Sequence, residues 1–310
     1  MSGTAEKILV IKLGAFGDMV QTDGALRDIR AFHGQAEITL LTTKAFLKLM
    51  GRCPHIDRVL VDPRVPFWKI GAWIALARTF RGESFSTVYD LQKSGRTELY
   101  RKLFFRTTSW SGRQTGPQAS SALAGFVAQL ENAGVPVRHC LAPDVSWMAD
   151  DMSLFLEREG VRKPYVVLIP GCSAKHPQKR WPYYAQLASA LIERGYAVVT
   201  APGPDEIELS KSLPGHVLLG PNGFLNWFEL AGVLKDACYV VGNDTGPSHV
   251  AACLGKPGLA LFGPHTSAAR TGIARGAFRA IEVPDLAALP VETVLEAVMS
   301  GLPPVQENSV

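Results

Sequence analysis

The sequence lacks the patterns that mark zinc proteins, secreted disulfide proteins and membrane-spanning proteins. Its five cysteines are scattered and are never spaced as CxxC or as zinc ligands, so we expect small buried thiols in a reduced, cytosolic chain. No uncharged run approaches the roughly 20 apolar residues of a spanning helix. The apolar start Ile8–Ile11 is cut short by Lys12, which argues against a signal peptide. We therefore expect a soluble protein.

The dinucleotide fingerprint GxGxxG is also absent, which argues against a nicotinamide oxidoreductase. What the sequence has is apolar material: 47% of its 310 residues are hydrophobic and 19% are charged. That amount suffices for two packed cores, and a chain of this length suits two domains of ordinary size.

Positive charge is concentrated in the first half of the chain. Residues 1–150 hold 19 Lys and Arg against 13 Asp and Glu, a net charge of +6, whereas the whole chain carries +4. Such a bias suggests an anionic partner for this half, although an ordinary solvated surface would also account for it.

Short apolar runs alternate with amphipathic stretches, which predicts an α/β protein with parallel sheets. The expected strands are Ile8–Ile11, Glu37–Thr42, Arg58–Val61, Thr87–Leu91, Tyr165–Ile169, Tyr196–Thr200, Val217–Leu219, Tyr239–Val241 and Gly258–Phe262. The expected helices include one near Val20–Ile29, then Ile70–Phe80, Leu123–Ala133, Asp151–Gly160, Tyr183–Arg194, Glu206–Leu213 and Val291–Ser300.

The series restarts after a Pro-containing stretch near Ala142–Trp147. We therefore expect two Rossmann-like, doubly wound domains, residues 1–150 and residues 151–310, facing each other across a cleft. Ligands of such sheets bind beyond the carboxyl ends of the strands.

The segment Gly242–His249, GNDTGPSH, follows one of these strands. Two glycines frame a tight turn, and a helix begins near Pro247, with Thr245 and Ser248 as possible caps. The N–H groups at a helix start bind anions. Asp244 disfavours a phosphate beside it but suits a sugar hydroxyl, so a sugar and a phosphate are expected to meet here. A plain strand–turn–helix junction is the alternative.

The segment Lys12–Asp18, KLGAFGD, follows the first strand. Its glycines, Gly14 and Gly17, let the backbone approach another molecule. Asp18 suits the cap of the following helix and also suits a general base at the mouth of the cleft.

Two further candidate sites follow strands of the second domain. A basic loop ends in Lys179-Arg180-Trp181-Pro182, where a fixed cation would stabilise a leaving diphosphate. Pro202–Glu206 offers a carboxylate for the two hydroxyls of a ribose. A solvated charge run and a helix cap are the respective alternatives.

Taken in this order, the four sites resemble glycosyltransferase family 9, the heptosyltransferase family of bacterial lipopolysaccharide synthesis. The resemblance is carried by ILVIKLGAFGDMVQTDGALRDIR, by KRWPYYAQLASAL and by VVGNDTGPSHVAACLGKPGLALFGP, and it extends from Ile8 to about Pro284. Tyr89–Gln92 also resembles the DLQ segment of the family.

The resemblance implies a GT-B fold, with the nucleotide-sugar donor bound by the C-terminal domain and the acceptor by the N-terminal one. It implies an inverting enzyme that needs neither a metal nor a cofactor, and the sequence has no DxD metal motif. Asp18 matches the general base of the family, and Lys179 matches the lysine at the donor phosphates.

Other donor-site roles follow from the same resemblance. Asp244 matches the aspartate that contacts the transferred sugar, and Glu206 is the best match for the ribose-binding acid. The remaining donor-binding candidates are Thr245, Gly246, Pro247, Ser248, His249, Ser173 and Lys175. The acceptor-binding candidates are Gly14, Gly17, Gln92 and Arg96.

Two departures from the family concern the donor. The family usually has Met or Leu where Ser248 stands, which affects the pocket wall. The stretch Ser173–Gln178 has a hydroxyl only at Ser173, and Lys175 supplies a cation instead.

The implied reaction transfers heptose from ADP-heptose to the lipopolysaccharide inner core, an acidic glycolipid of the lipid A–Kdo type. The implied location is cytoplasmic and peripheral at the inner face of the cytoplasmic membrane, with no nucleic-acid partner. A related GT-B enzyme using another nucleotide sugar or glycan acceptor is the alternative, and a non-catalytic nucleotide-binding module is a more distant one.

The segment Pro66–Arg78 mixes aromatic residues with cations. A core helix is favoured there over a helix resting on a membrane surface. Further candidate contacts for phosphate or carboxylate groups are Arg101, Lys102, Arg106 and Arg113.

Overall fold

The computed structural model describes residues 6–66, 68–112, 120–173 and 176–304. The chain forms two compact units that divide between Pro143 and Asp144. This boundary lies seven residues before the one expected from the sequence. Among the described residues, no helix has both the length and the hydrophobicity needed to cross a lipid bilayer.

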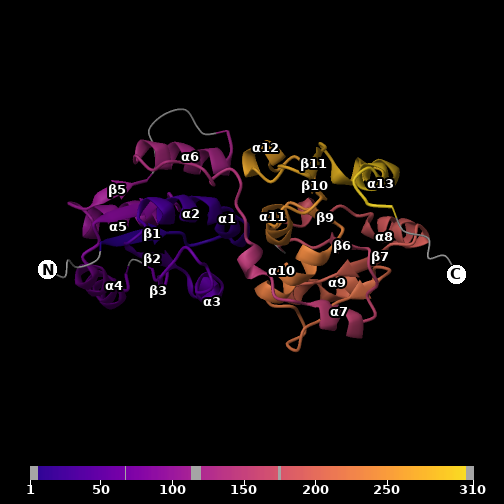
Figure 1. Cartoon of the computed structure of the whole chain (residues 1–310), viewed down its shortest axis with the longest axis horizontal. Coiled ribbons are helices and arrows are strands. Elements are labelled where there is room, and N and C mark those ends of the chain that lie inside the picture. Colours follow the sequence, from indigo (N-terminus) through magenta and orange to yellow (C-terminus); the bar gives the residue numbers. More distant parts are fainter. Residues whose placement is uncertain (1–5, 67, 113–119, 174–175, 305–310) are drawn as a thin grey trace. The chain divides into compact units, whose positions relative to one another are not determined.

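The first unit contains a five-stranded parallel sheet with the order β3-β2-β1-β4-β5. The strands are β1 (Lys7–Ile11), β2 (Glu37–Thr42), β3 (Arg58–Val61), β4 (Thr87–Asp90) and β5 (Ser109–Ser111). The helices are α1 (Phe16–Gln21), α2 (Asp23–Phe32), α3 (Leu47–Met50), α4 (Ile70–Glu83), α5 (Gly95–Phe104) and α6 (Ala122–Asn132). In Figure 1, α2 and α6 lie on one side of this sheet and α4 lies on the other.

Apolar side chains on one face of the central strand β1 form part of the core of this unit. Leu9 and Ile11 pack with Leu76 and Phe80 of α4 and with Tyr100 of α5. These side chains point to one face because successive residues of a strand alternate between faces. The core fixes the end of β1, and the segment that leads to Asp18 of α1 begins there.

The second unit contains a six-stranded parallel sheet with the order β11-β10-β9-β6-β7-β8. The strands are β6 (Tyr165–Ile169), β7 (Ala197–Thr200), β8 (His216–Val217), β9 (Tyr239–Asn243), β10 (Gly258–Phe262) and β11 (Phe278–Glu282). The helices are α7 (Ser153–Arg158), α8 (Tyr184–Glu193), α9 (Ile207–Lys211), α10 (Trp227–Asp236), α11 (Gly246–Cys253), α12 (Ala268–Thr271) and α13 (Val291–Met299).

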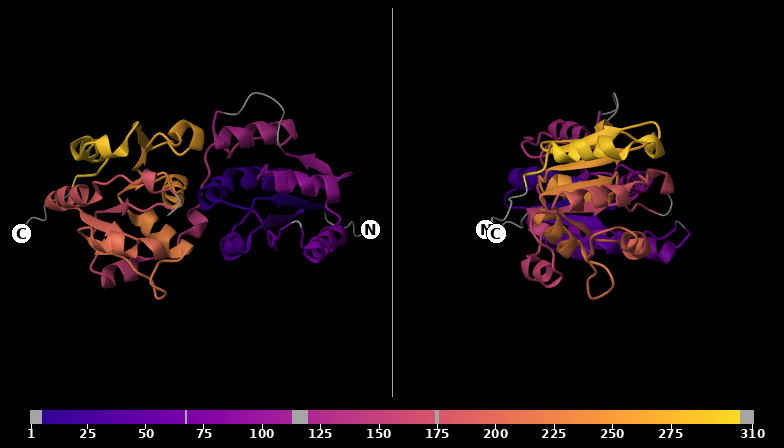
Figure 2. Two further views of the ribbon diagram at one scale, coloured as in Figure 1. Left: turned by 180° about the vertical axis from the view of Figure 1, so that it is seen from behind. Right: turned by 90° about the vertical axis from the view of Figure 1, so that its right-hand side faces the viewer.

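Helices cover both faces of the second sheet, as the views in Figure 2 show. Leu187 and Leu191 of α8 and Val294 and Val298 of α13 share one buried cluster with strand residues, while α10 and α11 contact each other. The central strands β6, β9 and β10 are buried along their whole length. This burial explains their continuous apolar runs, since both sides of each strand face helices.

Candidate functional site

Three predicted sites of the second unit lie at one edge of its sheet. Strands β9, β6 and β7 are neighbours and run parallel. Their carboxyl ends therefore lead into the Asp244 turn, the loop that bears Lys179, and the segment 201–206. This edge is where doubly wound sheets bind ligands.

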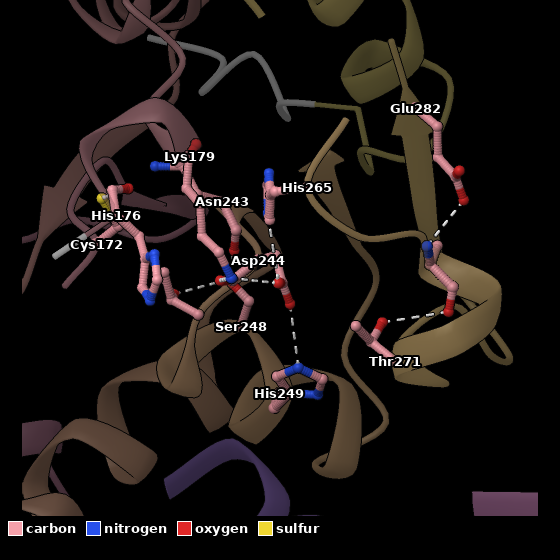
Figure 3. Close-up of polar contacts among 12 residues, drawn as sticks. Cys172, His176, Lys179, Asn243, Asp244, Ser248, His249, His265, Thr271 and Glu282 are labelled. Carbon is pink, nitrogen blue, oxygen red and sulfur yellow. Dashed lines mark hydrogen bonds and ion pairs between the residues drawn. The ribbon is translucent and has the colours of Figure 1, made fainter. Parts of the chain in front are cut away.

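Asp244 is the centre of a compact cluster of charged and basic side chains (Figure 3). Its Oδ2 accepts a hydrogen bond of 2.7 Å from Lys179 Nζ. His249 Nε2 lies 3.4 Å from Oδ1, and His265 Nε2 lies 3.8 Å from Oδ2. Only 8% of Asp244 is exposed. A buried carboxylate that Lys179 and His249 contact on its two oxygens is held as an anion in a defined position.

The contacts of Asp244 control its protonation. Burial by itself would raise the pKa of this carboxyl, but the hydrogen bonds from His249 and Lys179 outweigh burial and lower the pKa to about 2. For His265, burial is the larger effect, followed by the nearby Lys179, and both lower its pKa. Asp244 is thus an anion, and His265 is a neutral imidazole, near neutral pH.

The turn after Asp244 differs in detail from the expectation. Helix α11 begins at Gly246 with Thr245 at the N-cap position, but neither Thr245 nor Ser248 caps it through a side chain. Ser248 Oγ is buried and donates to the carbonyl of Asn243 at 2.7 Å. The expected capping role is therefore wrong for both hydroxyls.

Asn243 connects three parts of this edge, a role that the sequence analysis missed. Its buried Nδ2 donates to the carbonyls of Pro170 and Gly171 beyond β6. Its Oδ1 accepts from the backbone N–H of Trp181 and the hydroxyl of Tyr184 at the start of α8. Because these bonds hold the segment that follows Lys179, Asn243 positions that lysine. The only sequence indication was a polar residue at the end of a buried strand.

Glu206 lies at a cavity of about 690 Å³ beside the same edge. Ser173, Glu206 and Pro247 line it, together with apolar residues from the start of α10 and the loop before it: Phe224, Leu225, Trp227 and Leu230. Glu206 Oε2 accepts from the Gly203 N–H at 3.3 Å, and burial raises the pKa of Glu206. The cavity joins a carboxyl group to an apolar wall, a combination suited to a nucleoside.

The apolar wall was not predicted, because its residues follow the expected strand Val217–Leu219 without forming a charged or phosphate-binding motif. One indication was available, the capping box of Asn226 and Glu229 that starts α10. Lys175, expected to bind the donor, lies outside the described residues.

In the first unit, the Lys12–Asp18 loop adopts a conformation that requires glycine. Gly14 has φ +131°, and a Cβ there would come within 3.0 Å of the Phe46 ring. Gln92 Oε1 accepts from the Leu13 N–H at 2.9 Å, so Gln92, a residue predicted to bind the acceptor, supports this loop from the segment after β4.

Asp18 lies in the first turn of α1, which begins at Phe16 after Ala15 at the N-cap position. No side chain caps this helix, so the expected capping role of Asp18 is wrong. Its side chain is 54% exposed, and Oδ2 lies 3.9 Å from Nζ of the buried Lys12. Burial lowers the pKa of Lys12, while Asp18 opposes that shift. The carboxylate is accessible, as a base must be.

Arg96 does not present a free cation to an acceptor. Its Nε and one terminal nitrogen bind the buried Asp62 carboxylate at 2.9 and 2.8 Å, and its other terminal nitrogen donates to the Val65 carbonyl at 3.0 Å. The Tyr100 hydroxyl bonds both Asp62 and Arg96. These bonds give Arg96 a structural role, and its expected acceptor role stays a prediction.

Three other candidate cations line a surface hollow of about 420 Å³, namely Arg101, Lys102 and Arg106. Arg101 is paired there with Glu98 at 2.8 Å. Arg113 lies outside the described residues. Within the described part of the chain, no group of three or more His, Cys, Asp or Glu side chains is arranged to hold a metal ion.

The structure resembles solved GT-B proteins along nearly its whole length. A glycosyl transferase family 9 structure from Veillonella parvula matches with a TM-score of 0.79 and 20% identity, covering 97% of this chain and 98% of that one. The E. coli ADP-heptose lps heptosyltransferase II matches with a TM-score of 0.74 and 22% identity, covering 95% and 98%. The fold is therefore GT-B, built from two Rossmann-like units.

Sequence similarity identifies the family. The profile of glycosyltransferase family 9 (heptosyltransferase) matches residues 97–282, and the chain belongs to this family. Lipopolysaccharide heptosyltransferase 2 of Salmonella typhimurium is 27% identical over 224 residues. That match spans 62% of this chain and 62% of the length of the relative.

Proposed function

We propose that the protein is a glycosyltransferase that moves heptose from ADP-heptose to the inner core of lipopolysaccharide. The observation that carries the proposal is the Lys179–Asp244–His249 cluster at the start of α11, beside a cavity that contains Glu206. Family membership supports the reaction class. The names of its relatives, which include an ADP-heptose enzyme and a lipopolysaccharide enzyme, support the donor and the acceptor.

Each part of the donor has a matching group in the second unit. The apolar wall at Phe224 and Trp227 suits adenine, and the Glu206 carboxyl suits the ribose hydroxyls. Lys179 and the N–H groups at Thr245–His249 suit the diphosphate. Asp244 then contacts the hydroxyls of the sugar. The donor-binding roles of Gly246, Pro247 and Ser173 rest on their positions around this arrangement.

The proposed chemistry is a single displacement. Asp18 takes the proton of the acceptor hydroxyl, whose oxygen forms a bond to the anomeric carbon as the bond from that carbon to the diphosphate oxygen breaks. The configuration of the sugar inverts, no covalent enzyme intermediate forms, and ADP leaves beside Lys179. We expect no metal requirement, because Lys179 and the backbone N–H groups at the start of α11 offset part of the charge of ADP. For Asp18 to act as this base, the acceptor hydroxyl beside it must reach the anomeric carbon of the donor in the reacting complex.

The acceptor would be an acidic glycolipid at the inner face of the cytoplasmic membrane, which the protein contacts peripherally. The basic first half of the chain supports an anionic partner. Gly14, Gly17 and Gln92 would shape the acceptor side through the loop that they form or support.

Replacing the proposed base tests the mechanism. We expect Asp18→Ala to lose roughly 10²–10⁴-fold in turnover, the usual contribution of a general base. Affinity for ADP should remain, because the nucleotide groups lie in the second unit. Turnover of ADP-heptose with a lipopolysaccharide core acceptor and calorimetric titration of ADP measure the two effects. Wild-type turnover in the variant would exclude Asp18 as the base.

A panel of nucleotide sugars tests the donor. We expect thermal stabilisation by ADP-heptose and ADP, and little by UDP-sugars or GDP-sugars. Stabilisation by UDP-sugars alone would favour the alternative, a GT-B enzyme of this family with another donor.

A further inference from the structure

Helix α4 of the first unit has apolar residues on two different faces. Leu76 and Phe80 are buried against the sheet. Ile70 and Ile74 are instead 68% and 47% exposed, and Trp68, just before the helix, is 78% exposed. The sequence favoured a core helix for this segment, and only one face of the helix fulfils that expectation. The other face presents Ile70 and Ile74 to solvent, and Trp68 is exposed just before the helix begins.

The exposed face of α4 is also strongly basic. Residues 63–82 contain Arg64, Lys69, Arg78 and Arg81 and no Asp or Glu. Ile70, Ile74, Arg78 and Arg81 follow one another at intervals of three or four residues, so they share one side of the helix. Glu83, at the end of α4, is already paired with Lys7 and Arg58. Arg78 and Arg81 form no ion pair with any residue that the structure describes.

From this combination we infer that Trp68, together with the face of α4 that bears Ile70, Ile74, Arg78 and Arg81, docks on the surface of an anionic phospholipid bilayer. Isoleucine side chains would enter the boundary between headgroups and acyl chains, as in helices that lie in the plane of a membrane. The cations would lie among the lipid phosphates. Trp68 suits the same depth, because indole has an apolar body and a polar N–H.

Charge complementarity selects a bilayer as the occupant. A protein partner of stable affinity would bury a compact apolar patch and leave few unpaired charges at its centre. On α4 the exposed isoleucines lie in the first turns and the arginines in the last turns, and the helix holds no Asp or Glu before Glu83. The inference deepens the proposed function, since it names the surface by which an enzyme acting on a glycolipid would reach its acceptor.

Sedimentation with vesicles tests the apolar contribution. The probe is a phosphatidylglycerol–phosphatidylethanolamine vesicle without lipopolysaccharide or nucleotide, with pure phosphatidylcholine vesicles for comparison. Wild-type protein should sediment with the anionic vesicles only. The double variant Ile70→Ser/Ile74→Ser should lose at least tenfold in the partition coefficient. Leu154→Ser is the matched control, because Leu154 of α7 is 82% exposed in the second unit and should not matter.

A charge-matched pair tests the cations. Arg78→Gln/Arg81→Gln should lower the partition coefficient by roughly thirtyfold, since each cation at an anionic surface contributes about fivefold. Lys48→Gln/Arg194→Gln removes the same charge from exposed positions elsewhere and should bind like wild type. Added salt should lower the partition coefficient of the wild type and reduce its difference from Arg78→Gln/Arg81→Gln.

Failure of wild-type protein to bind anionic vesicles would overturn the inference, and so would equal binding by the α4 variants. Neither result would bear on the proposed transfer reaction, because the vesicles contain no donor or acceptor. Turnover with a deacylated, water-soluble core acceptor measures that reaction separately. The α4 variants should retain wild-type turnover in that assay.

Discussion

Gly171 leaves room for the Glu206 carboxyl group. A Cβ at residue 171 would lie 1.9 Å from Glu206 Oε1, so Gly171→Ala must displace this carboxyl group. We expect ADP affinity to fall about as far as in Glu206→Ala, by about 1.5–3 kcal/mol for lost hydrogen bonds to a charged group. Calorimetric titration of ADP measures the loss. Gly203→Ala is the control, since its Cβ would stay 3.7 Å from the same group. Unchanged affinity in Gly171→Ala would contradict the ribose role.

Burial of Glu206 predicts a pH dependence of nucleotide binding. Its pKa is raised above 4.5, so the ionised form that accepts hydrogen bonds from ribose is lost earlier as the pH falls. We expect ADP affinity to weaken between neutral pH and 4.5. Glu206→Gln should bind more weakly at neutral pH and show a flatter profile. Measuring ADP affinity of the wild type and of Glu206→Gln in the same buffers cancels the effect of the titration of ADP itself. Parallel pH profiles of the two proteins would argue against a role of Glu206 in binding ribose.

The same raised pKa has a consequence for stability. The folded protein holds the proton of Glu206 more tightly than the unfolded chain does, so protonation of this group favours the folded state. Its contribution to the free energy of unfolding therefore increases as the pH falls from neutral through the raised pKa. The contribution of Asp244 to stability changes with pH in the opposite direction. Its pKa of about 2 means that it contributes stability above about pH 4, which is lost as the pH falls toward 2.

Single residues at the ends of strands were the part of the site most accessible from sequence. Lys179, Glu206 and Asp244 each follow a parallel strand, and neighbouring strand ends share one edge. Side-chain direction was not accessible: Ser248 turns inward to the Asn243 carbonyl, and Arg96 turns to Asp62. Both directions depend on partners that are distant in sequence or on the exact geometry of a turn.

At the scale of elements, Arg96 joins α5 to the loop after β3. Asp62 has no exposed side-chain surface, and Arg96 is its charged partner. We expect Arg96→Met to lower the free energy of unfolding by about 3–5 kcal/mol, because it leaves a buried carboxylate without its cation. Chemical denaturation measures this change. Arg101→Met breaks an exposed pair with Glu98 and should cost less than about 1 kcal/mol. If Arg96→Met kept wild-type stability but bound the acceptor more weakly, the result would support a direct role of Arg96 in acceptor binding.

Four strands, β2, β3, β6 and β10, have the expected bounds. β2, β6 and β10 lie inside their sheets, where coverage of both faces produces continuous apolar runs. β3 is a partly exposed edge strand whose short apolar run was nevertheless sufficient. The edge strands β5 and β11 were missed. β5 has three residues, and β11 is half exposed, so neither carries an apolar run. Helices α5 and α10 were also missed, although capping boxes at Ser94 and Asn226 begin them.

At the scale of the whole molecule, the groups proposed to bind the donor all lie within residues 144–310, which form one compact unit. That unit has its own buried cluster around β6 and α8. We expect residues 144–310, produced alone, to unfold cooperatively and to bind ADP within about fivefold of the full chain. Residues 1–143 should not bind ADP. Loss of ADP binding by a folded 144–310 unit would show that the first unit contributes to the nucleotide site.

We expect the ion pair between Lys179 and Asp244 to affect how quickly product leaves. Any incoming phosphate must compete with a carboxylate that already holds this ammonium group at 2.7 Å. Such an internal competitor weakens nucleotide affinity. It also accelerates departure, since Lys179 has a partner ready as ADP dissociates. Asp244→Asn should therefore slow ADP release and make ADP a stronger product inhibitor.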